Sequence, residues 1–367
     1  MSDIKALYST KKRNKKRFMI TAVLVLLISA FVALCISTKF NSPLVVLQNY
    51  GHAFFPSLIE ATSAVDFVIL TRIISPRVLV AVITGFSLGL AGTVMQSLLR
   101  NPLVSPFTLG LSSAAGFGAA LIMVVGPIIA SGLYYSSFTI IGEHITGANI
   151  MVLISAFGFG LLSMGAVLLM CRSKNVSQSV IILAGVIIGY LFQAGITALK
   201  YISNDSALRE ITIWLMGGMW GVNWSSCLII LPICLMCSIV IIRQAKLFNV
   251  MAGGDDVAKS LGVDVHKFRS RSLVIVTLMA SACIGFTGII GFVGLMAPHI
   301  CRMLIGNDHK YLLLASGLMG AIILLISDTV ARVIILPQEL PVGVIMYILG
   351  GIFFIYLITK KRGNNLQ

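Results

Sequence analysis

Very few side chains within the long apolar stretches of this sequence could take part in chemistry. The one carboxylate inside such a stretch is Asp328, while His299 and Arg302 lie near the end of another. Asp328 and Arg332 are four residues apart, so a helix would place them on one face, where the two charges can neutralise each other. We interpret Asp328 as one half of a structural ion pair; a relay role in ion-driven transport is the alternative.

Motifs for enzymatic chemistry are missing from the sequence. It contains no Gly-Lys dipeptide, and hence no phosphate-binding loop, and no His-Glu-x-x-His motif or other cluster suited to a metal. Cys234-Leu-Met-Cys237 has redox spacing but lies in the middle of an apolar stretch, so we interpret all 7 cysteines as packing residues. An intramembrane enzyme using His299 would lack a partner base. We therefore expect no catalytic residue, no metal site and no cofactor in this chain.

The composition indicates a membrane protein. Of the 367 residues, 58% are hydrophobic and only 11% are charged, whereas a soluble domain has about 25% charged residues. These values exclude a soluble enzyme and a disordered chain. Basic loops on one side of a membrane explain the net charge of +15, so we expect no nucleic-acid partner.

The elements that must position these residues are predicted to be membrane-spanning helices, each about 20 apolar residues long. Eight such stretches are separated by charges and turn residues, at 18–38, 78–99, 107–129, 150–171, 179–199, 225–242, 312–330 and 342–359. A further stretch, 272–301, is too long for one span at about 1.5 Å per residue. Because glycines interrupt it, we predict two spans there, the second one short, joined by a turn near 286–291. The predicted fold class is all-α, a polytopic membrane protein with ten transmembrane helices.

The basic residues indicate the orientation of the chain. Most of the 27 Lys and Arg residues, including the run at 11–17, fall on one side of this ten-helix arrangement, which the positive-inside rule assigns to the cytoplasm. We therefore predict that both termini are cytoplasmic, with a basic tail at 1–17, a transmembrane domain at 18–360 and a second tail at 361–367. A signal peptide cleaved near Cys35 is the alternative, but its apolar core would be unusually long.

Small residues and prolines indicate where helices pack and where the chain turns. In lipid no hydrophobic force acts between helices, so close packing depends on small side chains. A rigid turn is predicted at 100–106, because its two prolines cannot continue a helix. The residues that we expect to serve packing or to line a pathway are Gly85, Gly89, Asn101, Pro102, Gly110, Gly288, Gly291 and Pro298.

A short amphipathic helix is predicted in the cytoplasmic segment 248–271. Two aspartates after a pair of glycines suit the positive start of a helix, three apolar residues form one face, and a further glycine suits the end. Such a helix is well suited to docking in a cleft of a partner that supplies energy. A connector lying on the lipid surface is the alternative. The docking residues that we predict are Asp255, Asp256, Val257, Ala258, Leu261 and Gly262.

Eight short motifs, in this order, resemble one family of proteins. They are Ser75-Pro-Arg77, Gly92-Thr-Val-Met-Gln96, Asn101-Pro-Leu-Val-Ser-Pro106, Gly254-Asp-Asp-Val-Ala258, Gly288-Ile-Ile-Gly-Phe-Val-Gly-Leu295, Pro298-His299, Asp328-Thr-Val-Ala-Arg332 and Glu339-Leu-Pro-Val-Gly343. With the predicted spans, they extend over nearly the whole chain. The chain resembles the FecCD-type permeases of ABC importers for ferric siderophores, haem and cobalamin.

The resemblance implies a set of partners and a location. The partners are a second permease subunit, expected to be another copy of this chain, two cytoplasmic ABC ATPase subunits that bind ATP and Mg²⁺, and an extracytoplasmic substrate-binding protein. In such importers the ATPases dock on the loop that corresponds to 248–271, the segment that the residues themselves indicate. The implied location is the cell (cytoplasmic or inner) membrane.

The resemblance also implies contacts to the binding protein. In relatives, outer-side arginines pair with glutamates of that protein, and the matching positions here are Arg77 and Arg332. Another arginine usually lies three residues before the first of these, where this chain has Ile74, and Arg72 is the nearest substitute. Arginine–carboxylate contacts are directional, so a displaced arginine is not equivalent. Anchoring at the membrane surface is the alternative role for both matching arginines.

These observations predict the transmembrane permease of a binding-protein-dependent ABC importer. We expect it to move an iron(III)-siderophore or a related metal chelate into the cell by ATP-driven alternating access. Haem or cobalamin is the alternative cargo, and an ion-gradient-driven secondary transporter is the alternative of another class. No residue in the sequence is diagnostic of the cargo, because a large ligand in a channel needs weak, dispersed contacts.

Overall fold

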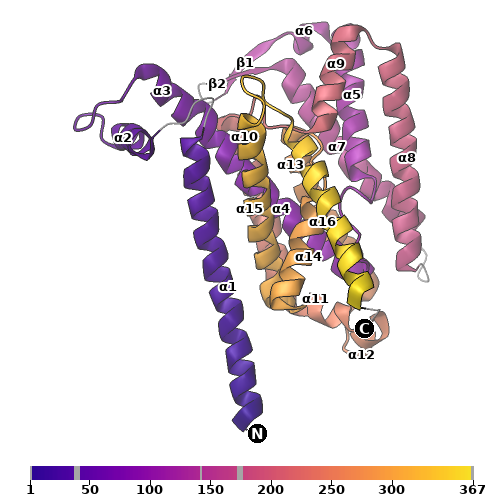
Figure 1. The fold of residues 1–367 in the computed structure, drawn as a ribbon. Helices are drawn as coiled ribbons and strands as arrows, with labels where there is room; N and C mark the ends of the chain where they lie inside the picture. Colours follow the sequence, from indigo (N-terminus) through magenta and orange to yellow (C-terminus); the bar gives the residue numbers. More distant parts are fainter. Residues whose placement is uncertain (1, 37–41, 141–142, 172–176, 365–367) are drawn as a thin grey trace.

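The computed structural model describes residues 2–36, 42–140, 143–171 and 177–364 of the chain, most of which are helical (Figure 1). The helices before the hairpin are α1 (Ser2–Cys35), α2 (Pro43–Phe54), α3 (Ala64–Val68), the π-helical turn η1 (Ile69–Ile74), α4 (Ser75–Leu99), α5 (Leu111–Ile129) and α6 (Ser131–Tyr134). The two strands β1 (Ser137–Ile140) and β2 (Glu143–Thr146) form an antiparallel hairpin. The remaining helices are α7 (Gly147–Met170), α8 (Gln178–Ile202), α9 (Asp205–Met216), α10 (Trp224–Arg243), α11 (Ala245–Ala252), α12 (Asp255–Ser260), α13 (Val265–Thr287), α14 (Val293–Ile305), α15 (His309–Val333) and α16 (Val342–Asn364).

The predicted membrane-spanning stretches are helices in the structure. Within the described residues, nine helices are long and apolar enough to cross a membrane, and α14 is a shorter apolar helix. The stretch 272–301 is divided near the predicted turn, by a break at 288–292 in which Gly288 and Phe292 adopt positive φ angles of 64° and 65°. With 13 residues, α14 is about 20 Å long, which is less than the hydrocarbon thickness. The chain is an all-α polytopic membrane protein.

Several helix starts differ from the prediction by three residues or more, and two of them have a clear local reason. The second spanning helix is predicted to begin at Val78, but α4 begins at Ser75 and continues from α3 and η1. Pro76 fits this position because proline is tolerated in the first turn of a helix. The third spanning helix, α5, begins at Leu111, since Gly110 with φ of 78° turns the chain immediately before it.

Helix α4 lies at the centre of the bundle, where it packs against α10, α13, α14 and α15 (Figure 1). Glycines bring α4 and α15 together. A Cβ atom at Gly85 would collide with the carbonyl oxygen of Gly320, and one at Gly89 would collide with that of Ser316. The two backbones are therefore in direct contact, which supplies the van der Waals packing that holds helices together in lipid.

The other helices surround this centre. Helices α7 and α8 both pack against α5, on one side of the bundle. On the other side, α1 packs along α15. Only 11% of the apolar window of α1 is buried, so most of this helix is left to face lipid.

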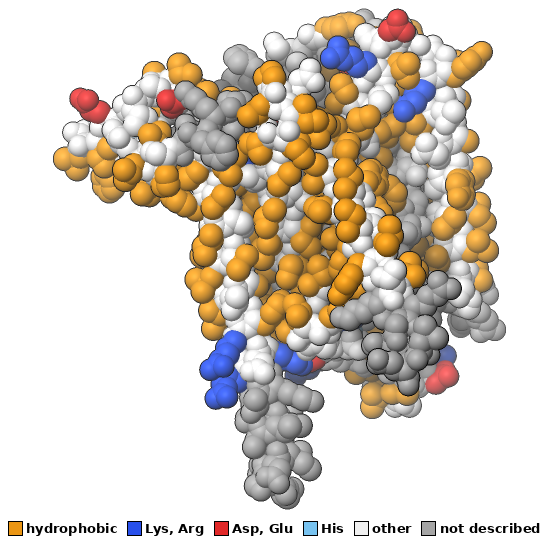
Figure 2. All heavy atoms as spheres, in the orientation of Figure 1, with side chains coloured by type: hydrophobic (Ala, Val, Ile, Leu, Met, Phe, Trp, Pro, Cys, Tyr) orange, Lys and Arg blue, Asp and Glu red, His pale blue; other side chains and the backbone are white. Residues whose placement is uncertain are grey.

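The elements outside the membrane lie at two opposite ends of the molecule. Figure 1 shows α11, α12 and both termini at one end, and α2, α3, α6, α9 and the β1–β2 hairpin at the other. Basic side chains gather where α1 leaves the apolar surface at the first of these ends (Figure 2). In keeping with the positive-inside rule, we call it the cytoplasmic end and the opposite one the outer end.

Candidate functional site

Helix α12 forms the most prominent feature of the cytoplasmic end. It follows Gly254, whose φ angle of 125° favours glycine, and it is followed by Gly262 with φ of 81°. The N–H of Val263 donates to the carbonyl of Ala258 at 3.0 Å, and the N–H of Gly262 to that of Lys259 at 2.9 Å. These bonds close the end of a helix in the manner of a glycine cap. The predicted short helix therefore exists, with both ends set by glycine.

The side chains predicted to form its apolar contact point in two directions. Val257 and Leu261 are 49% and 65% exposed, and their four-residue spacing places them on one outward face. Ala258 has no exposed surface, so its side chain packs into the protein and cannot belong to that face. Asp256 is fully exposed and lies 3.5 Å from Lys259. The exposed surface of α12 thus consists of Val257 and Leu261 with a charged rim.

The sequence suggested that Asp255 caps the helix. In the structure its side chain makes no cap hydrogen bond and instead pairs with residues of the helical bundle. Its two carboxylate oxygens lie 2.9 and 2.8 Å from Nη2 of Arg269 in α13. The same carboxylate pairs with Arg100, the residue that ends α4, and accepts a hydrogen bond of 3.3 Å from Gln178 at the start of α8. Because these partners lie in α13, at the start of α8 and directly after the end of α4, Asp255 connects α12 to three long helices of the membrane domain.

Two surface hollows flank α12. One, of about 490 Å³, lies beside Leu261 and is lined by Gln244, Leu247, Leu261, Gly262, Val263, Asp264, Lys267, Phe268 and Arg271. The other, of about 390 Å³, is lined by Arg100, Ser177, Gln178 and residues 253–257.

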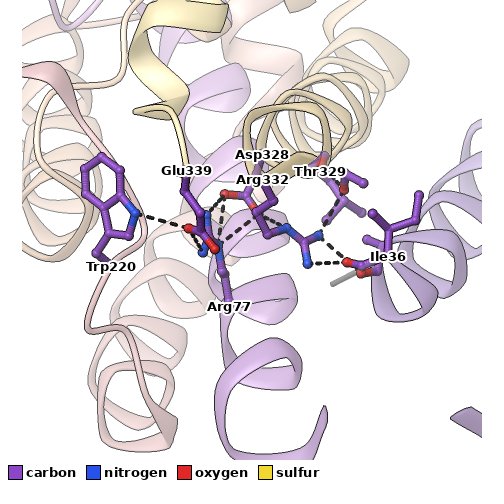
Figure 3. Close-up of polar contacts among 9 residues, drawn as sticks. Ile36, Arg77, Trp220, Asp328, Thr329, Arg332 and Glu339 are labelled. Carbon is purple, nitrogen blue, oxygen red and sulfur yellow. Dashed lines mark hydrogen bonds and ion pairs between the residues drawn. The ribbon is translucent and has the colours of Figure 1, made fainter. Parts of the chain in front are cut away.

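A charged cluster at the outer end contains Arg77 (Figure 3). Its Nε is 3.1 Å from both carboxylate oxygens of Asp328, and its Nη2 is 2.9 Å from one of them. Its Nη1 lies 2.7 Å from Glu339, which also accepts a hydrogen bond of 3.1 Å from the indole of Trp220. Asp328 is completely buried. Burial of a charge is costly unless it is paired, and this arginine supplies the pairing.

Arg332 belongs to the same cluster and adds a second guanidinium to Asp328. Its Nε lies 3.3 Å from the carboxylate, which confirms the predicted pairing across one helical turn. Its Nη1 donates to the carbonyl of Ile36, just beyond the end of α1, at 2.7 Å. Its Nη2 donates to the carbonyl of Ala33, within α1, at 3.2 Å, and to the hydroxyl of Thr329 (Figure 3). The arginine therefore ties α1 to α15.

The structure places the predicted docking arginines inside the protein. Arg77 and Arg332 are only 7% and 3% exposed, and both hold internal carboxylates. Arg72 is the more accessible arginine, and it lies 3.1 Å from Glu143 of the β1–β2 hairpin. Neither buried guanidinium is presented on the surface in this conformation.

The predicted packing residues mostly lie where backbones approach closely. Besides Gly85 and Gly89, a Cβ atom at Gly110 would meet the carbonyl of Gly185 at 2.5 Å. Gly288 faces the carbonyl of Trp214, and Gly291 lies opposite the Tyr347 ring. The other three residues are not at such close approaches. Asn101 accepts a hydrogen bond of 2.9 Å from the N–H of Leu103, and Pro102 lies in the same turn. Pro298 is buried within α14.

Several partners in these contacts were not found from the sequence. Arg269, Gln178 and Trp220 have no motif or spacing that would single them out. Gln96 could have been identified from the sequence, because it is a polar amide within an otherwise apolar span. Its Nε2 donates to the carbonyl of Gly294 at 3.1 Å, and its Oε1 accepts a bond from Arg302. Among the described residues, no group of three or more His, Cys, Asp or Glu side chains could hold a metal ion.

Comparison with known proteins places the chain in a family. Residues 23–360 match the model of the FecCD transport family. The chain is 38% identical to the hemin transport system permease of Yersinia pestis, with 78% of this chain and 82% of the relative covered. It is 32% identical to the Fe(3+)-citrate import system permease of Bacillus subtilis, with 95% and 96% covered. It is 35% identical to the vitamin B12 import system permease of Serratia proteamaculans, with 78% and 80% covered.

A solved structure has the same fold. It is the inward-facing conformation of an ABC transporter classed as of the metal-chelate type. The TM-score is 0.79 at 27% sequence identity, and the match covers 94% of this chain and 99% of the other. Its apolar spanning helices make the chain a multi-pass protein of the inner (cell) membrane. The family match over residues 23–360 shows that the chain belongs to the FecCD transport family.

Proposed function

We propose that this chain is the permease subunit of a binding-protein-dependent ABC importer for an iron(III)-siderophore or a related metal chelate. Relatives named for hemin, Fe(3+)-citrate and vitamin B12 transport support this class of cargo. Haem and cobalamin are the alternative cargoes, because the described residues include no feature that discriminates among these ligands.

The observation that carries the proposal is the placement of α12. It presents Val257 and Leu261 to the cytoplasm while the Asp255 carboxylate contacts three long helices. An ATPase that binds this face can displace α12 when it closes on ATP. The charge-assisted contacts of Asp255 then transmit the displacement to α4, α8 and α13, which is what alternating access requires.

The proposed complex has three kinds of component. A second copy of this chain completes the pathway, two ABC ATPase subunits bind ATP and Mg²⁺ and dock on α12, and an extracytoplasmic binding protein delivers cargo to the outer end. A symmetric pair of copies can enclose a pathway along the interface between them.

Docking of the binding protein through Arg77 and Arg332 requires an exchange of partners. Both guanidinium groups are bound to internal carboxylates, and Glu339, with a quarter of its side chain exposed, is the accessible member of the cluster. A glutamate of the binding protein would replace Glu339 as the partner of Arg77. Docking in this form therefore opens the charged cluster at the outer end.

The cluster gives no support to a carrier driven by an ion gradient. A proton relay needs a carboxylate that can release its present partner, whereas the Asp328 carboxylate is held by two arginines and has no exposed surface. These contacts support a structural role for Asp328.

Reconstitution tests the proposed function. The chain is placed in proteoliposomes alone, with its ATPase, and with both the ATPase and the binding protein. We expect accumulation of the chelate only in the complete system with ATP on the side of α12. Accumulation by the chain alone under an ion gradient would show a secondary transporter instead. Titration of the binding protein with ferric siderophores, haem and cobalamin then identifies the cargo.

A further inference from the structure

The outer end carries a projection that the transport function does not explain. It consists of α2, the return segment 55–63 and α3, and it extends sideways from the bundle beside the outer end of α1 (Figure 1). Its contact with the outer end of the bundle includes the Tyr50 hydroxyl, which lies 2.6 Å from that of Ser75 at the start of α4. The projection is therefore attached to the central helix.

Hydrogen bonds fold the projection into one unit. Gln48 donates to the carbonyl of Glu60 at 2.9 Å, and the His52 ring lies 2.6 Å from the carbonyl of Ile59. The Asn49 side chain accepts bonds of 3.1 Å from both the backbone N–H and the hydroxyl of Thr62. The polar side chains of α2 thus hold the return segment, while Leu44, Leu47 and Phe54 of the same helix remain exposed.

The exposed surface of the projection is strongly apolar. Leu44 and Leu47 of α2 are 76% and 57% exposed, Phe54 at its end is 76% exposed, and Leu58 in the return segment is 81% exposed. Leu44, Leu47 and Phe54 lie on one face of the helix, because positions separated by three and seven residues share a face. Water would meet four large apolar side chains here, which is unfavourable for a surface of a soluble element.

The apolar side points toward the membrane. Figure 2 shows hydrophobic side chains along the lower edge of the projection, the edge that meets the apolar surface of α1, and acidic side chains on its upper edge. The charged residues of 42–68 are Glu60 and Asp66, with no Lys or Arg. On α1 itself Leu24 and Leu27 are 54% and 61% exposed, so this helix also presents apolar side chains on its surface.

We propose that α2 and the return segment lie on the outer leaflet of the membrane, with Leu44, Leu47, Phe54 and Leu58 inserted at the boundary between headgroups and acyl chains. An amphipathic helix in this position buries its apolar face in the interface. The segment has no basic residue, so its binding depends on apolar burial and not on anionic lipid. A binding protein would approach the outer end from the side opposite to this face.

Fluorescence quenching in lipid nanodiscs tests the proposal. An environment-sensitive fluorophore is attached to Leu58→Cys or, as a matched control two residues away, to Glu60→Cys in the full-length chain. Cys35→Ser serves as the background for both, because Cys35 is partly exposed while the other cysteines are buried. We expect doxyl-labelled lipid to quench the probe at 58 and aqueous iodide to quench the probe at 60. The lipid quenching at 58 should be the same in zwitterionic and anionic nanodiscs.

Three results would contradict the proposal. Quenching of the probe at 58 by iodide and not by lipid would place this face in water. Protection of the same probe from both quenchers would mean that protein covers the face, such as the second copy of this chain. A requirement for anionic lipid would contradict the apolar mode of binding.

Discussion

Arg269 and Asp255 join the exposed helix α12 to the spanning helix α13, with Arg269 Nη2 lying 2.9 and 2.8 Å from the two carboxylate oxygens. Arg269 is only 7% exposed, whereas α12 carries Leu261 into the solvent. A movement of α12 must either carry α13 with it or break this charge-assisted contact. In the mechanism that we propose, this pair transmits a movement of the cytoplasmic surface to the membrane domain.

Replacement of Asp255 tests this connection. In Asp255→Asn the side chain keeps its shape but loses the charge that pairs with the nearly buried Arg269. We expect a loss of about 1–3 kcal/mol in stability, because a buried charged donor is left poorly satisfied. The ATPase should still bind, while uptake per ATP hydrolysed falls. Thermal unfolding and transport assays on the same preparation measure the two effects.

The matched control for this substitution is Asp256→Asn. The Asp256 side chain is fully exposed and its contact is a surface pair with Lys259, so we expect no change in uptake per ATP. Equal coupling in Asp255→Asn and the wild type would contradict the anchoring role.

Leu261 is expected to contribute to ATPase binding. Leu261→Asp places a charge on the face of α12 that is 65% exposed in the isolated chain. Desolvation of that charge in an interface should weaken binding by at least about tenfold, which corresponds to about 1.4 kcal/mol. Leu261→Met keeps the apolar surface and should bind normally. Co-purification and substrate-stimulated ATP hydrolysis are the measurements, and normal values for both in Leu261→Asp would contradict the docking role.

The contact between α4 and α15 predicts different costs for two glycine substitutions. Gly85→Ala inserts a methyl group against the backbone of Gly320, and overpacking of this kind costs about 1–3 kcal/mol. Gly158→Ala meets no atom within 4 Å and should leave stability unchanged or slightly raised, since alanine favours helices. The thermal midpoint in detergent measures both. A Gly85→Ala protein as stable as Gly158→Ala would show that the helices are not in contact.

The charged cluster predicts a difference between two arginines. Arg332→Gln removes a guanidinium that is 3% exposed and leaves the buried Asp328 with one fewer partner, a change that costs about 3–5 kcal/mol in other buried pairs. Arg72→Gln removes an exposed pair with Glu143 and should cost less than about 1 kcal/mol. Thermal unfolding distinguishes the two.

The same variants test the docking of the binding protein. If Arg332 contacts a glutamate of that protein, Arg332→Gln lowers the affinity and makes it less sensitive to salt, because one ion pair is lost. If Arg72 is the substitute for the arginine missing at position 74, Arg72→Gln has this effect instead. Unchanged affinity in both variants at low and high salt would contradict docking through either arginine.

Asp308, between α14 and α15, predicts a dependence of stability on pH. Burial raises the pKa of its carboxyl, but hydrogen bonds from Asn249 and from the Lys310 backbone, together with Lys15, outweigh this and hold the pKa below its usual value. A group with a lowered pKa in the folded state stabilises the protein above its unfolded pKa, about 4. This contribution is lost as the pH falls through the lower, folded value. Thermal unfolding is followed from about one pH unit below that unfolded pKa to about three units above it. We expect the thermal midpoint to fall toward acid pH, and to fall less in Asp308→Asn than in the wild type. An identical fall in both proteins would contradict the assignment.

The positions of most helices could be predicted because they depend on local features. An uninterrupted apolar run is stable in lipid only as a helix, so the spans follow directly from hydropathy. The ends of α12 follow from Gly254 and Gly262, whose positive φ angles other residues rarely adopt. The Asp328–Arg332 pair was also predictable, since four residues make one helical turn.

The functional contacts depended on which helix faces meet, and this is a property of the whole bundle. Asp255 pairs with Arg100 across 155 residues, and Arg77 pairs with Asp328 across 251. The inward position of Ala258 and the burial of Arg77 follow from the same packing. Hydropathy determines that a segment forms a spanning helix, but the rotation of that helix is set by the sum of its contacts with every neighbour. Only the tertiary structure decides which charges become partners.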